Sequence, residues 1–362
     1  MRKVEVPGKL ENFPEIIILS MAKGWGGAEE YLELLRRDLV KRGFSHRLIV
    51  REGKEYAKRG KMRDTLLEAP HSASGYLSFL SKQRLVGSGR KVVHAHRYYD
   101  ILRGWTIKRK VPGSKLVLYQ QCYLNHPNSL PLSMTDGILC ISDFVKRSIT
   151  SSFPELEGKT TVVNPGVDLA LFDRAKKGYA TEGPVKIGMV GRFDKNQEEL
   201  LEIGGMLKRK GFRISIHLVG EGTAEEEDNL RSVADREGIG GETHFRGIVL
   251  HDEIPPFYRE MDIMASTMKN EGLSLVAMEA MASGVPFVAY GSSGFTELID
   301  NGENGILVDG DACMFADCLT KLIESEDLRK EMGTRAAEKG KSHFGMDLNV
   351  EKYLTFIEKL FD

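Results

Sequence analysis

The feature that most constrains the fold is a regular alternation of short apolar runs with amphipathic helical stretches. The apolar runs of the first half are EIIILS (15–20), HRLIV (46–50), KVVHAH (91–96), KLVLYQ (115–120), GILCIS (137–142) and TTVVN (160–164). Those of the second half are VKIGMVG (185–191), RISIHLVG (213–220), THFRGI (243–248), MDIMAS (261–266), PFVAY (286–290) and GILV (305–308). Helical periodicity lies between them at 28–43, 143–149, 197–210 and 224–237, with Ser142 as the expected N-cap of the second helix. This strand–helix–strand order predicts an α/β protein with doubly wound parallel sheets.

The alternation occurs in two blocks, which predicts two domains. It breaks at DRAKKGYATEGP (173–184), and 362 residues suit two domains of ~150 residues each. We place an N-terminal domain at 1–175 and a C-terminal domain at 176–346. The last segment, 347–362, predicts a helix whose apolar face needs a surface to cover it. Its apolar residues are Val350, Tyr353, Leu354, Ile357, Leu360 and Phe361.

Charge is distributed unevenly along the chain. Residues 1–180 carry 31 Lys and Arg against 18 Asp and Glu, a net charge of +13, whereas residues 181–362 carry 20 against 34, a net charge of −14. This asymmetry indicates two units with different partners. The basic half suits an anionic lipid surface, an acidic saccharide or a nucleic acid, and the acidic half suits none of these. Alternatively, both are only well solvated surfaces.

The composition also indicates the compartment. The four cysteines lack metal-ligand spacing, which indicates reduced thiols. The N-terminal residues are charged, and no apolar run approaches the ~20 residues that cross a bilayer. We therefore predict a cytoplasmic protein that at most lies on the cytoplasmic face of a membrane.

The segment NEGLSLVAMEAMASGVP (270–286) holds two carboxylates, Glu271 and Glu279, in an otherwise apolar or small run. Ser274 is the expected N-cap of a buried helix, Gly284 the left-handed residue after its end, and Pro286 a stop. A buried carboxylate is costly unless it is paired or hydrogen-bonded, and the neighbouring sequence offers Glu279 no cation. A vicinal diol would satisfy Glu279, and amides at the helix N-terminus would bind phosphate. A ribose, a diphosphate and a sugar fit this order of groups; alternatively, both carboxylates pair with basic residues elsewhere in the fold.

This segment resembles the E-x7-E signature of the retaining GT-B glycosyltransferases of family 4, also called group 1. The stretch GGAEEYLELLRRDLVKRG resembles the family's glycine loop and first helix, and VVHAH, VVNPGVDLALF, VGRF, HLVGEG, HFRGIV and GENGILV follow in the family's order. The resemblance implies two Rossmann-like domains facing across a cleft, with a nucleotide sugar held mainly by the C-terminal domain. It also implies that the last helix crosses back to the N-terminal domain.

The resemblance implies a role for each matching position. Glu279 accepts ribose hydroxyls, Glu271 accepts hydroxyls of the transferred sugar, Arg192 lies on the diphosphate, Gly247 and Ile248 lie near the base, and Gly272, Leu273, Ser274 and Leu275 supply amides to the sugar and diphosphate. Gly26 and Gly27 bring a loop close to the phosphates, where the lack of a side chain permits approach. The alternative for these two glycines is an ordinary tight turn.

Two positions depart from the family's pattern. In the family, a Lys usually follows the Arg at a greater distance along the chain. In GRFDKNQ, Lys195 follows Arg192 by only three residues. We expect a shortened loop in which Lys195 still neutralises the diphosphate; the alternative is a solvated lysine. Many members carry a His where this chain has Gln120, which puts acid–base help from that position in doubt. His96 lies near the expected cleft on the acceptor side, although a His at a strand end is as often structural.

We therefore predict a retaining, metal-independent glycosyltransferase without a cofactor. It would move a sugar from a nucleotide-diphosphate sugar, with a UDP-hexose favoured, to a glycan, glycolipid or lipopolysaccharide-type acceptor. The expected catalytic residues are Arg192, Lys195 and Glu271, and we expect no nucleic-acid partner. Alternatives are a nucleotide-sugar epimerase of the same architecture and a non-catalytic relative that binds a membrane or a partner. An NAD(P) oxidoreductase is disfavoured, because no G-x-G-x-x-G follows the first strand of either half.

Overall fold

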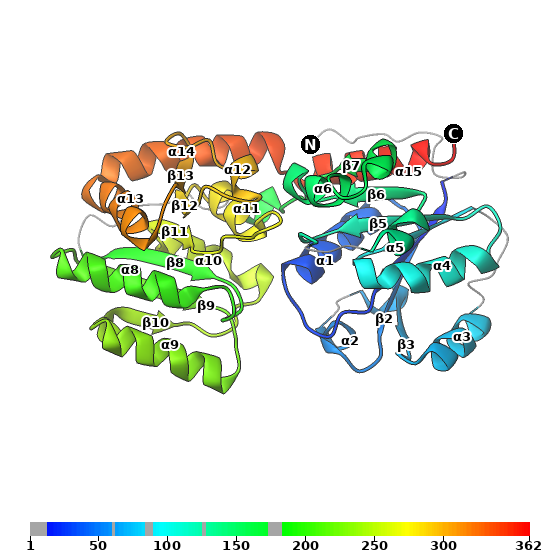
Figure 1. The fold of residues 1–362 in the computed structure, drawn as a ribbon, viewed down its shortest axis with the longest axis horizontal. Helices are drawn as coiled ribbons and strands as arrows, with labels where there is room; N and C mark the ends of the chain where they lie inside the picture. The colour runs from blue at the N-terminus through cyan, green and yellow to red at the C-terminus, as the bar shows by residue number, and fades with distance from the viewer. Residues whose placement is uncertain (1–12, 60–61, 84–89, 125–127, 173–182) are drawn as a thin grey trace. The chain divides into compact units, whose positions relative to one another are not determined.

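A computed structural model shows the chain as two compact units (Figure 1). The N-terminal unit comprises Met1–Gly166 and Met346–Asp362, and the C-terminal unit comprises Val167–Gly345. The structure describes residues 13–59, 62–83, 90–124, 128–172 and 183–362. The boundary expected between residues 175 and 176 lies outside them. Val167 belongs to the C-terminal unit, where its N–H donates to Phe344 O at 2.8 Å.

The N-terminal unit is built on one parallel sheet of seven strands in the order β3-β2-β1-β4-β5-β6-β7. The strands are β1 (Glu15–Ser20), β2 (His46–Arg51), β3 (Leu66–Ala69), β4 (Lys91–Ala95), β5 (Lys115–Gln120), β6 (Gly137–Cys140) and β7 (Thr160–Val162). The helices are α1 (Gly27–Lys41), α2 (Glu55–Arg59), α3 (Ala73–Lys82), α4 (Ile101–Lys110), α5 (Ser129–Ser133), α6 (Asp143–Thr150) and α15 (Met346–Lys359), with 3-10 turns η1 (Arg63–Thr65), η2 (Tyr98–Asp100) and η3 (Pro154–Lys159). In register, Ile18 of β1 lies between Leu48 of β2 and His94 of β4.

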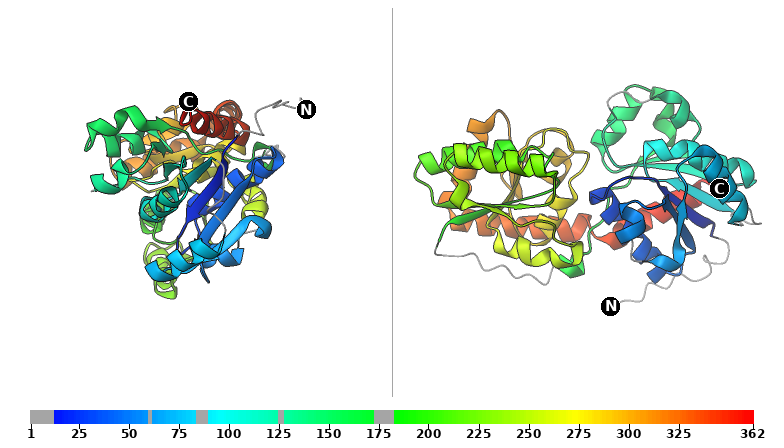
Figure 2. Two further views of the ribbon diagram at one scale, coloured as in Figure 1. Left: turned by 90° about the vertical axis from the view of Figure 1, so that its right-hand side faces the viewer. Right: turned by 90° about the horizontal axis from the view of Figure 1, so that it is seen from below.

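The C-terminal unit is built on a parallel sheet of six strands in the order β10-β9-β8-β11-β12-β13. The strands are β8 (Val185–Val190), β9 (Ile214–Val219), β10 (Thr243–Phe245), β11 (Ile263–Ser266), β12 (Phe287–Tyr290) and β13 (Gly305–Val308). The helices are α7 (Leu169–Phe172), α8 (Gln197–Arg209), α9 (Ala224–Arg236), α10 (Pro255–Glu260), α11 (Leu275–Ala282), α12 (Phe295–Leu298), α13 (Ala312–Glu324) and α14 (Glu326–His343), with 3-10 turns η4 (Gly240–Glu242) and η5 (His251–Glu253). Helices cover both faces of each sheet (Figure 2). Two doubly wound parallel sheets are thus confirmed.

The local signals in the sequence explain where several elements begin and end. Ser142 Oγ accepts the Val145 N–H at 3.1 Å and caps α6 as expected. Gly43, at φ +80°, follows the end of α1. The strand expected at 243–248 is too long, because β10 stops at Phe245 and Gly247 then turns the chain at φ +66°.

Helix α15 packs against α1 within the N-terminal unit. Val350, Tyr353, Leu354 and Ile357 of its expected apolar face are buried. Gly137 of β6 permits a close approach of this helix, because a Cβ there would lie 2.5 Å from Phe356 Cζ. None of the described helices is long and apolar enough to cross a membrane.

Candidate active site

The residues predicted for the C-terminal unit gather at the carboxyl edge of its sheet. Arg192 and Lys195 follow β8, Gly247 and Ile248 follow β10, and 271–279 follow β11 and enter α11. Loops at the carboxyl ends of parallel strands form the ligand-binding edge of doubly wound sheets. The residues predicted for the other unit, namely Gly26, Gly27, His96 and Gln120, lie at the carboxyl ends of β1, β4 and β5.

Gln197 closes the turn that carries the two predicted cations. Its Nε2 donates to Arg192 O at 2.6 Å, and its Oε1 accepts the Lys195 N–H at 3.0 Å. The exposed Arg192 guanidinium pairs with Asp194 at 2.8 Å. The short KNQ turn therefore has a defined backbone that holds Lys195 close to the end of β8.

Lys195 reaches one of the two predicted carboxylates. Its Nζ lies 3.2 Å from Glu271 Oε2, and the two side chains are 38% and 24% exposed. A partly exposed pair of this kind contributes about 1 kcal/mol or less, so an incoming diphosphate can compete for the ammonium group. The contact also fits the alternative in which Glu271 merely has a basic partner.

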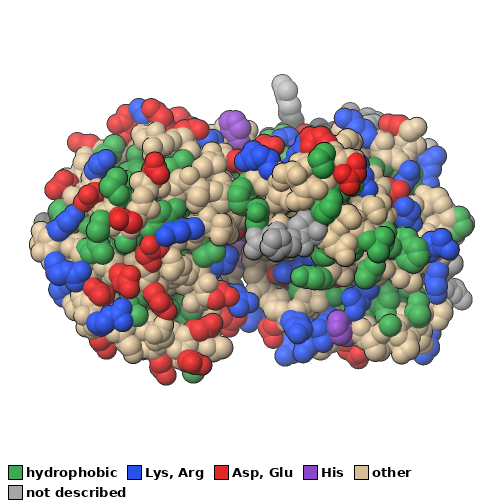
Figure 3. All heavy atoms as spheres, in the orientation of Figure 1, with side chains coloured by type: hydrophobic (Ala, Val, Ile, Leu, Met, Phe, Trp, Pro, Cys, Tyr) green, Lys and Arg blue, Asp and Glu red, His purple; other side chains and the backbone are tan. Residues whose placement is uncertain are grey.

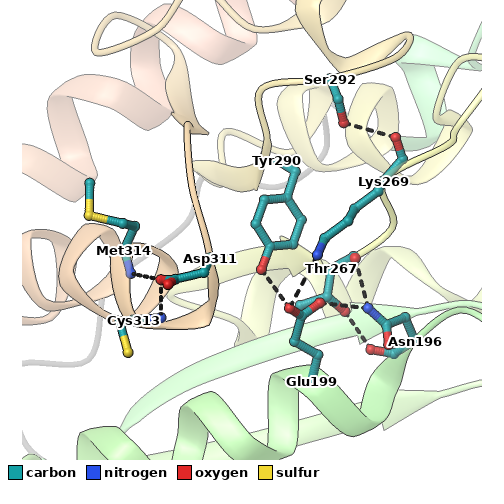
Figure 4. Close-up of polar contacts among 9 residues, drawn as sticks. All are labelled: Asn196, Glu199, Thr267, Lys269, Tyr290, Ser292, Asp311, Cys313 and Met314. Atoms are coloured by element: carbon teal, nitrogen blue, oxygen red, sulfur yellow. Dashed lines mark hydrogen bonds and ion pairs between the residues drawn. The ribbon is translucent and has the colours of Figure 1, made fainter.

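The residue after Lys195 belongs to a network of polar contacts at the strand ends (Figure 4). Asn196 has a left-handed backbone at φ +62°. Its Nδ2 donates to Thr267 O at 3.0 Å and to Glu199 Oε2 at 2.6 Å. Glu199 also accepts the Tyr290 hydroxyl at 2.7 Å and lies 3.7 Å from Lys269 Nζ. These contacts thus fix the turn after β8 and the loop after β11 to the end of β12.

Helix α11 begins and ends at the predicted residues. Ser274 Oγ accepts the Ala277 N–H at 3.1 Å, and Gly284 adopts φ +69°. The helix is eight residues long, and residues 277–282 are all buried. Its N-terminal amides carry the positive end of the helix dipole, and its N-cap, Ser274, follows Glu271 by three residues.

Glu279 has two partners that the neighbouring sequence did not reveal. The carboxylate is 4% exposed. The Tyr258 hydroxyl donates to Oε2 at 2.5 Å, and His251 Nε2 lies 3.1 Å from Oε1, from 21 and 28 residues upstream. The buried carboxylate thus does not depend on a ligand for hydrogen bonds, which corrects the sequence-based argument. An ionised carboxylate accepts about four hydrogen bonds, so these two contacts leave capacity for hydroxyl groups.

The loop after β12 contributes two residues that the sequence analysis missed. The Gly294 N–H donates to Glu271 O at 2.8 Å. A Cβ at residue 294 would lie 2.1 Å from Gly272 O, so only glycine permits this contact. Ser293 adopts φ +61°, and its buried Oγ has no hydrogen-bond partner among the described residues. The sequence does indicate a turn here, because GSSG (291–294) directly follows an apolar run.

A D-x-D tripeptide, Asp309–Gly310–Asp311, was also missed. Closely spaced carboxylates of this kind can ligate a divalent cation. In this chain, however, Asp311 Oδ1 accepts the N–H groups of Cys313 at 2.9 Å and Met314 at 3.2 Å (Figure 4). The second carboxylate of the tripeptide therefore caps α13.

In the N-terminal unit, Gly26 is the N-cap of α1. Its backbone is extended at φ −171°, and its O accepts the N–H groups of Glu29 and Glu30 at 3.0 Å. A Cβ added there would meet nothing closer than Glu29 Oε2 at 3.8 Å. The described residues therefore leave room for a Cβ at residue 26, although glycine is also favoured at an N-cap, and its approach to a phosphate stays a prediction.

His96 and Gln120 are both buried in the N-terminal unit. His96 Nε2 lies 2.9 Å from Ala28 O and its Nδ1 lies 3.4 Å from His94 Nε2. Burial lowers the pKa of His96 to about 3. Gln120 Nε2 donates to Cys122 O at 2.7 Å, while Oε1 has no partner among the described residues. Contact of either residue with an acceptor stays a prediction.

Comparison with known proteins matches both halves of the chain to glycosyltransferase families. Residues 184–325 match the family model described as Glycosyl transferases group 1, and residues 25–171 match that described as Glycosyltransferase Family 4. The lipopolysaccharide core biosynthesis glycosyltransferase LpsE of Rhizobium meliloti (strain 1021) is 27% identical over 92% of this chain and 96% of its own length. A D-inositol 3-phosphate glycosyltransferase of Corynebacterium efficiens is 32% identical over 50% of this chain and 46% of its own length.

The fold has solved counterparts. The crystal structure of Anabaena Alr3699/HepE in complex with UDP has a TM-score of 0.80 at 18% identity and covers 95% of this chain and 100% of the other. The same Anabaena protein is also known in complex with UDP-glucose. At this identity the likeness establishes the architecture, which is GT-B.

Proposed function

We propose that this chain, which belongs to the GT-B glycosyltransferases, transfers a sugar from a nucleotide-diphosphate sugar to a hydroxyl group of a glycan, glycolipid or lipopolysaccharide-type acceptor. The observation that carries the proposal is the contact of Lys195 with Glu271, three residues before the N-cap of α11. The names of the relatives support the two substrate classes, because one acts in lipopolysaccharide core synthesis and the Anabaena protein holds UDP. A UDP-hexose is the donor we favour.

The departing diphosphate would be stabilised by cations and backbone amides. Arg192 and Lys195 supply two positive charges, and residues 272–275 supply amides at the positive end of the α11 dipole. When the diphosphate binds, Lys195 exchanges its contact with Glu271 for a phosphate oxygen. This arrangement requires no metal and no other cofactor.

The remaining groups would hold the nucleoside and the sugar. Glu279, already oriented by Tyr258 and His251, accepts the ribose hydroxyls. Glu271, released from Lys195, accepts hydroxyls of the transferred sugar. Backbone atoms of Gly247 and Ile248 lie against the base. We propose front-face attack with retention, in which the leaving phosphate takes the proton of the acceptor hydroxyl.

The acceptor would approach the basic N-terminal unit, and its surface supports a membrane-borne acceptor. Leu102 and Trp105 of α4 are 58% and 37% exposed, and Tyr99 just before them is 80% exposed. Arg109 lies over the Trp105 ring at 5.2 Å. Figure 3 shows hydrophobic side chains on this unit with Lys and Arg around them. Aromatic, aliphatic and basic side chains side by side are typical of a surface that contacts anionic lipid.

Turnover and donor affinity, measured separately in EDTA, test the proposal. We would follow UDP release from UDP-glucose with a panel of glycan and lipopolysaccharide acceptors. Arg192→Ala and Lys195→Ala are expected to lower kcat by about 100-fold, with a smaller loss of donor affinity, because the charge they stabilise develops during transfer. Arg335→Ala, on an exposed surface of α14, is the matched control.

Three results would contradict the proposal. Wild-type turnover in both variants would place the site elsewhere. An epimerised sugar, formed without an acceptor, would favour the epimerase alternative. Lack of any nucleotide-sugar binding would favour a non-catalytic relative.

A further inference from the structure

Four basic side chains gather at the carboxyl edge of the N-terminal sheet. They come from separate elements: Lys23 follows β1, Arg51 ends β2, His71 follows β3 and Arg103 lies in α4. Arg103 Nη2 lies 3.0 Å from both the Nδ1 and the O of His71. Arg51 and Lys23 end or follow β2 and β1, which lie next to β3 in the sheet, so they share its carboxyl edge with His71, and their charges act on the His71 ring. Figure 3 shows Lys and Arg side chains grouped with a histidine on this unit.

In the part of the chain that the structure describes, no carboxylate forms an ion pair with the cations of this cluster. Among the described residues, Lys23 and Arg51 form no ion pair and no side-chain hydrogen bond. The charges that act on His71 are those of Arg51, Arg103 and Lys23, and together they lower its pKa. Asp100 faces Arg103, but burial raises the pKa of Asp100 to about 7. Near neutral pH this carboxyl is therefore only partly ionised.

The local backbone adds to the positive field. Ser72, the residue after His71, is the N-cap of α3, and its Oγ accepts the Gly75 N–H at 3.3 Å. The positive end of this ten-residue helix therefore begins beside the cluster. Arg103 is also held over the Tyr76 ring at 5.8 Å, which limits the movement of its guanidinium.

We propose that Lys23, Arg51, His71 and Arg103 form a binding site for a phosphoryl group of the acceptor. The proposal rests on the proposed function, because the donor diphosphate is assigned to the C-terminal unit and leaves these cations for another anion. An arginine fork with a second arginine, a lysine and an imidazole supplies the donors that a phosphate monoester accepts. The phosphoryl group belongs either to a soluble sugar phosphate or to a lipid headgroup.

The test uses His71 as a local reporter. We would titrate the histidine rings of the full-length protein by ¹H–¹³C NMR, with and without inorganic phosphate, and assign His71 with His71→Gln. Bound phosphate should raise the pKa of His71, because an adjacent anion favours the imidazolium form. Arg51→Ala and the exposed Lys23→Ala should each weaken phosphate binding by about tenfold, equal to about 1.4 kcal/mol. Lys146→Ala, a basic residue of α6 in the same unit whose ammonium pairs with Glu157, should not.

An unchanged His71 titration with phosphate, or equal phosphate affinity in wild type, Arg51→Ala and Lys23→Ala, would overturn the proposal. UDP binding, measured on the same samples, separates it from the proposed function. If the protein binds UDP but phosphate leaves the pKa of His71 unchanged, only the phosphoryl site is contradicted. If phosphate raises the pKa of His71 but UDP does not bind, only the proposed donor site is contradicted. Binding of glucose 6-phosphate and of vesicles of phosphatidylglycerol with phosphatidylcholine then distinguishes the two sources. Weaker binding of glucose 6-phosphate by Arg51→Ala than by wild type indicates a soluble sugar phosphate, and weaker binding of the vesicles indicates a lipid headgroup.

Discussion

At the scale of single residues, Ser293 is held in a conformation that favours glycine. Its φ is +61°, and it precedes Gly294, which contacts the backbone of Glu271. A left-handed backbone costs a non-glycine residue about 1–2 kcal/mol, and strain of this kind often occurs at functional sites. We expect the loop after β12 to keep this residue for its buried hydroxyl.

We predict that Ser293→Gly raises the free energy of unfolding by up to about 1 kcal/mol, because relief of strain exceeds the added entropy of the unfolded chain. Urea unfolding of purified variants measures the difference. Ser292→Gly is the neighbouring control and should be destabilising, since the Ser292 hydroxyl donates to Lys269 O at 2.8 Å. A loss of stability in Ser293→Gly as large as that of the control would contradict the strain argument.

For Gly26 we predict a change in donor affinity without a change in stability. Gly26→Ala should leave the unfolding midpoint unchanged, because the added Cβ meets only an ordinary contact. It should lower donor affinity several-fold if the glycine loop approaches the phosphates. The contrasting variant is Gly294→Ala, which must displace the Gly272 carbonyl and so lower stability. Unchanged donor affinity in a stable Gly26→Ala protein would exclude this role for the loop.

At the scale of elements, α15 is attached to the N-terminal sheet through buried polar groups. The Tyr353 hydroxyl lies 2.9 Å from His94 Nδ1, and His94 Nε2 lies 3.4 Å from His96 Nδ1. His96 Nε2 in turn contacts Ala28 O. All three hydrogen bonds can form when both imidazole rings are neutral and carry their proton on Nε2. It links the C-terminal helix to the first turn of α1, directly after the glycine loop.

The sign of the resulting pH dependence follows from burial. Burial lowers the pKa of His94 well below its ordinary value and that of His96 to about 3. In the unfolded chain both titrate near about 6.5, so acid adds protons to the unfolded state first. We predict that stability falls as the pH drops from about 6.5 towards 3. Urea unfolding at several pH values checks this, and His96→Gln should flatten the slope; an unchanged slope would contradict the argument.

Tyr353→Phe isolates the attachment of the helix itself. It removes the hydroxyl and leaves His94 Nδ1 buried without its partner, which costs about 1–3 kcal/mol. We expect this loss in the free energy of unfolding at neutral pH. Tyr98→Phe, whose hydroxyl contacts the exposed Asn128 backbone, should cost less. An equal loss of unfolding free energy in both variants would contradict a stabilising role for the buried contact between Tyr353 and His94.

At the scale of the whole molecule, the sequence predicted the periodic elements and missed what depends on distant contacts. Both parallel sheets and the capped helix α11 follow from local periodicity and from Ser274 and Gly284. Strand β3 was missed because it has four residues, of which only Ala69 is buried. The partners of Glu279 were missed because Tyr258 and His251 reach it across the fold. The basic cluster around His71 was missed because its members are separated in sequence.

Calorimetry of UDP binding in EDTA tests the central claim most directly, namely that the carboxyl edge of the C-terminal sheet holds the donor nucleotide. We would compare wild type with Glu279→Gln, which keeps the shape of the buried side chain, and with Glu303→Gln, whose carboxylate pairs with Arg335 on the surface. We predict that wild type and Glu303→Gln bind UDP alike and that Glu279→Gln binds at least about tenfold more weakly, a loss of about 1.4 kcal/mol. UDP binding of equal affinity in all three proteins would contradict the account.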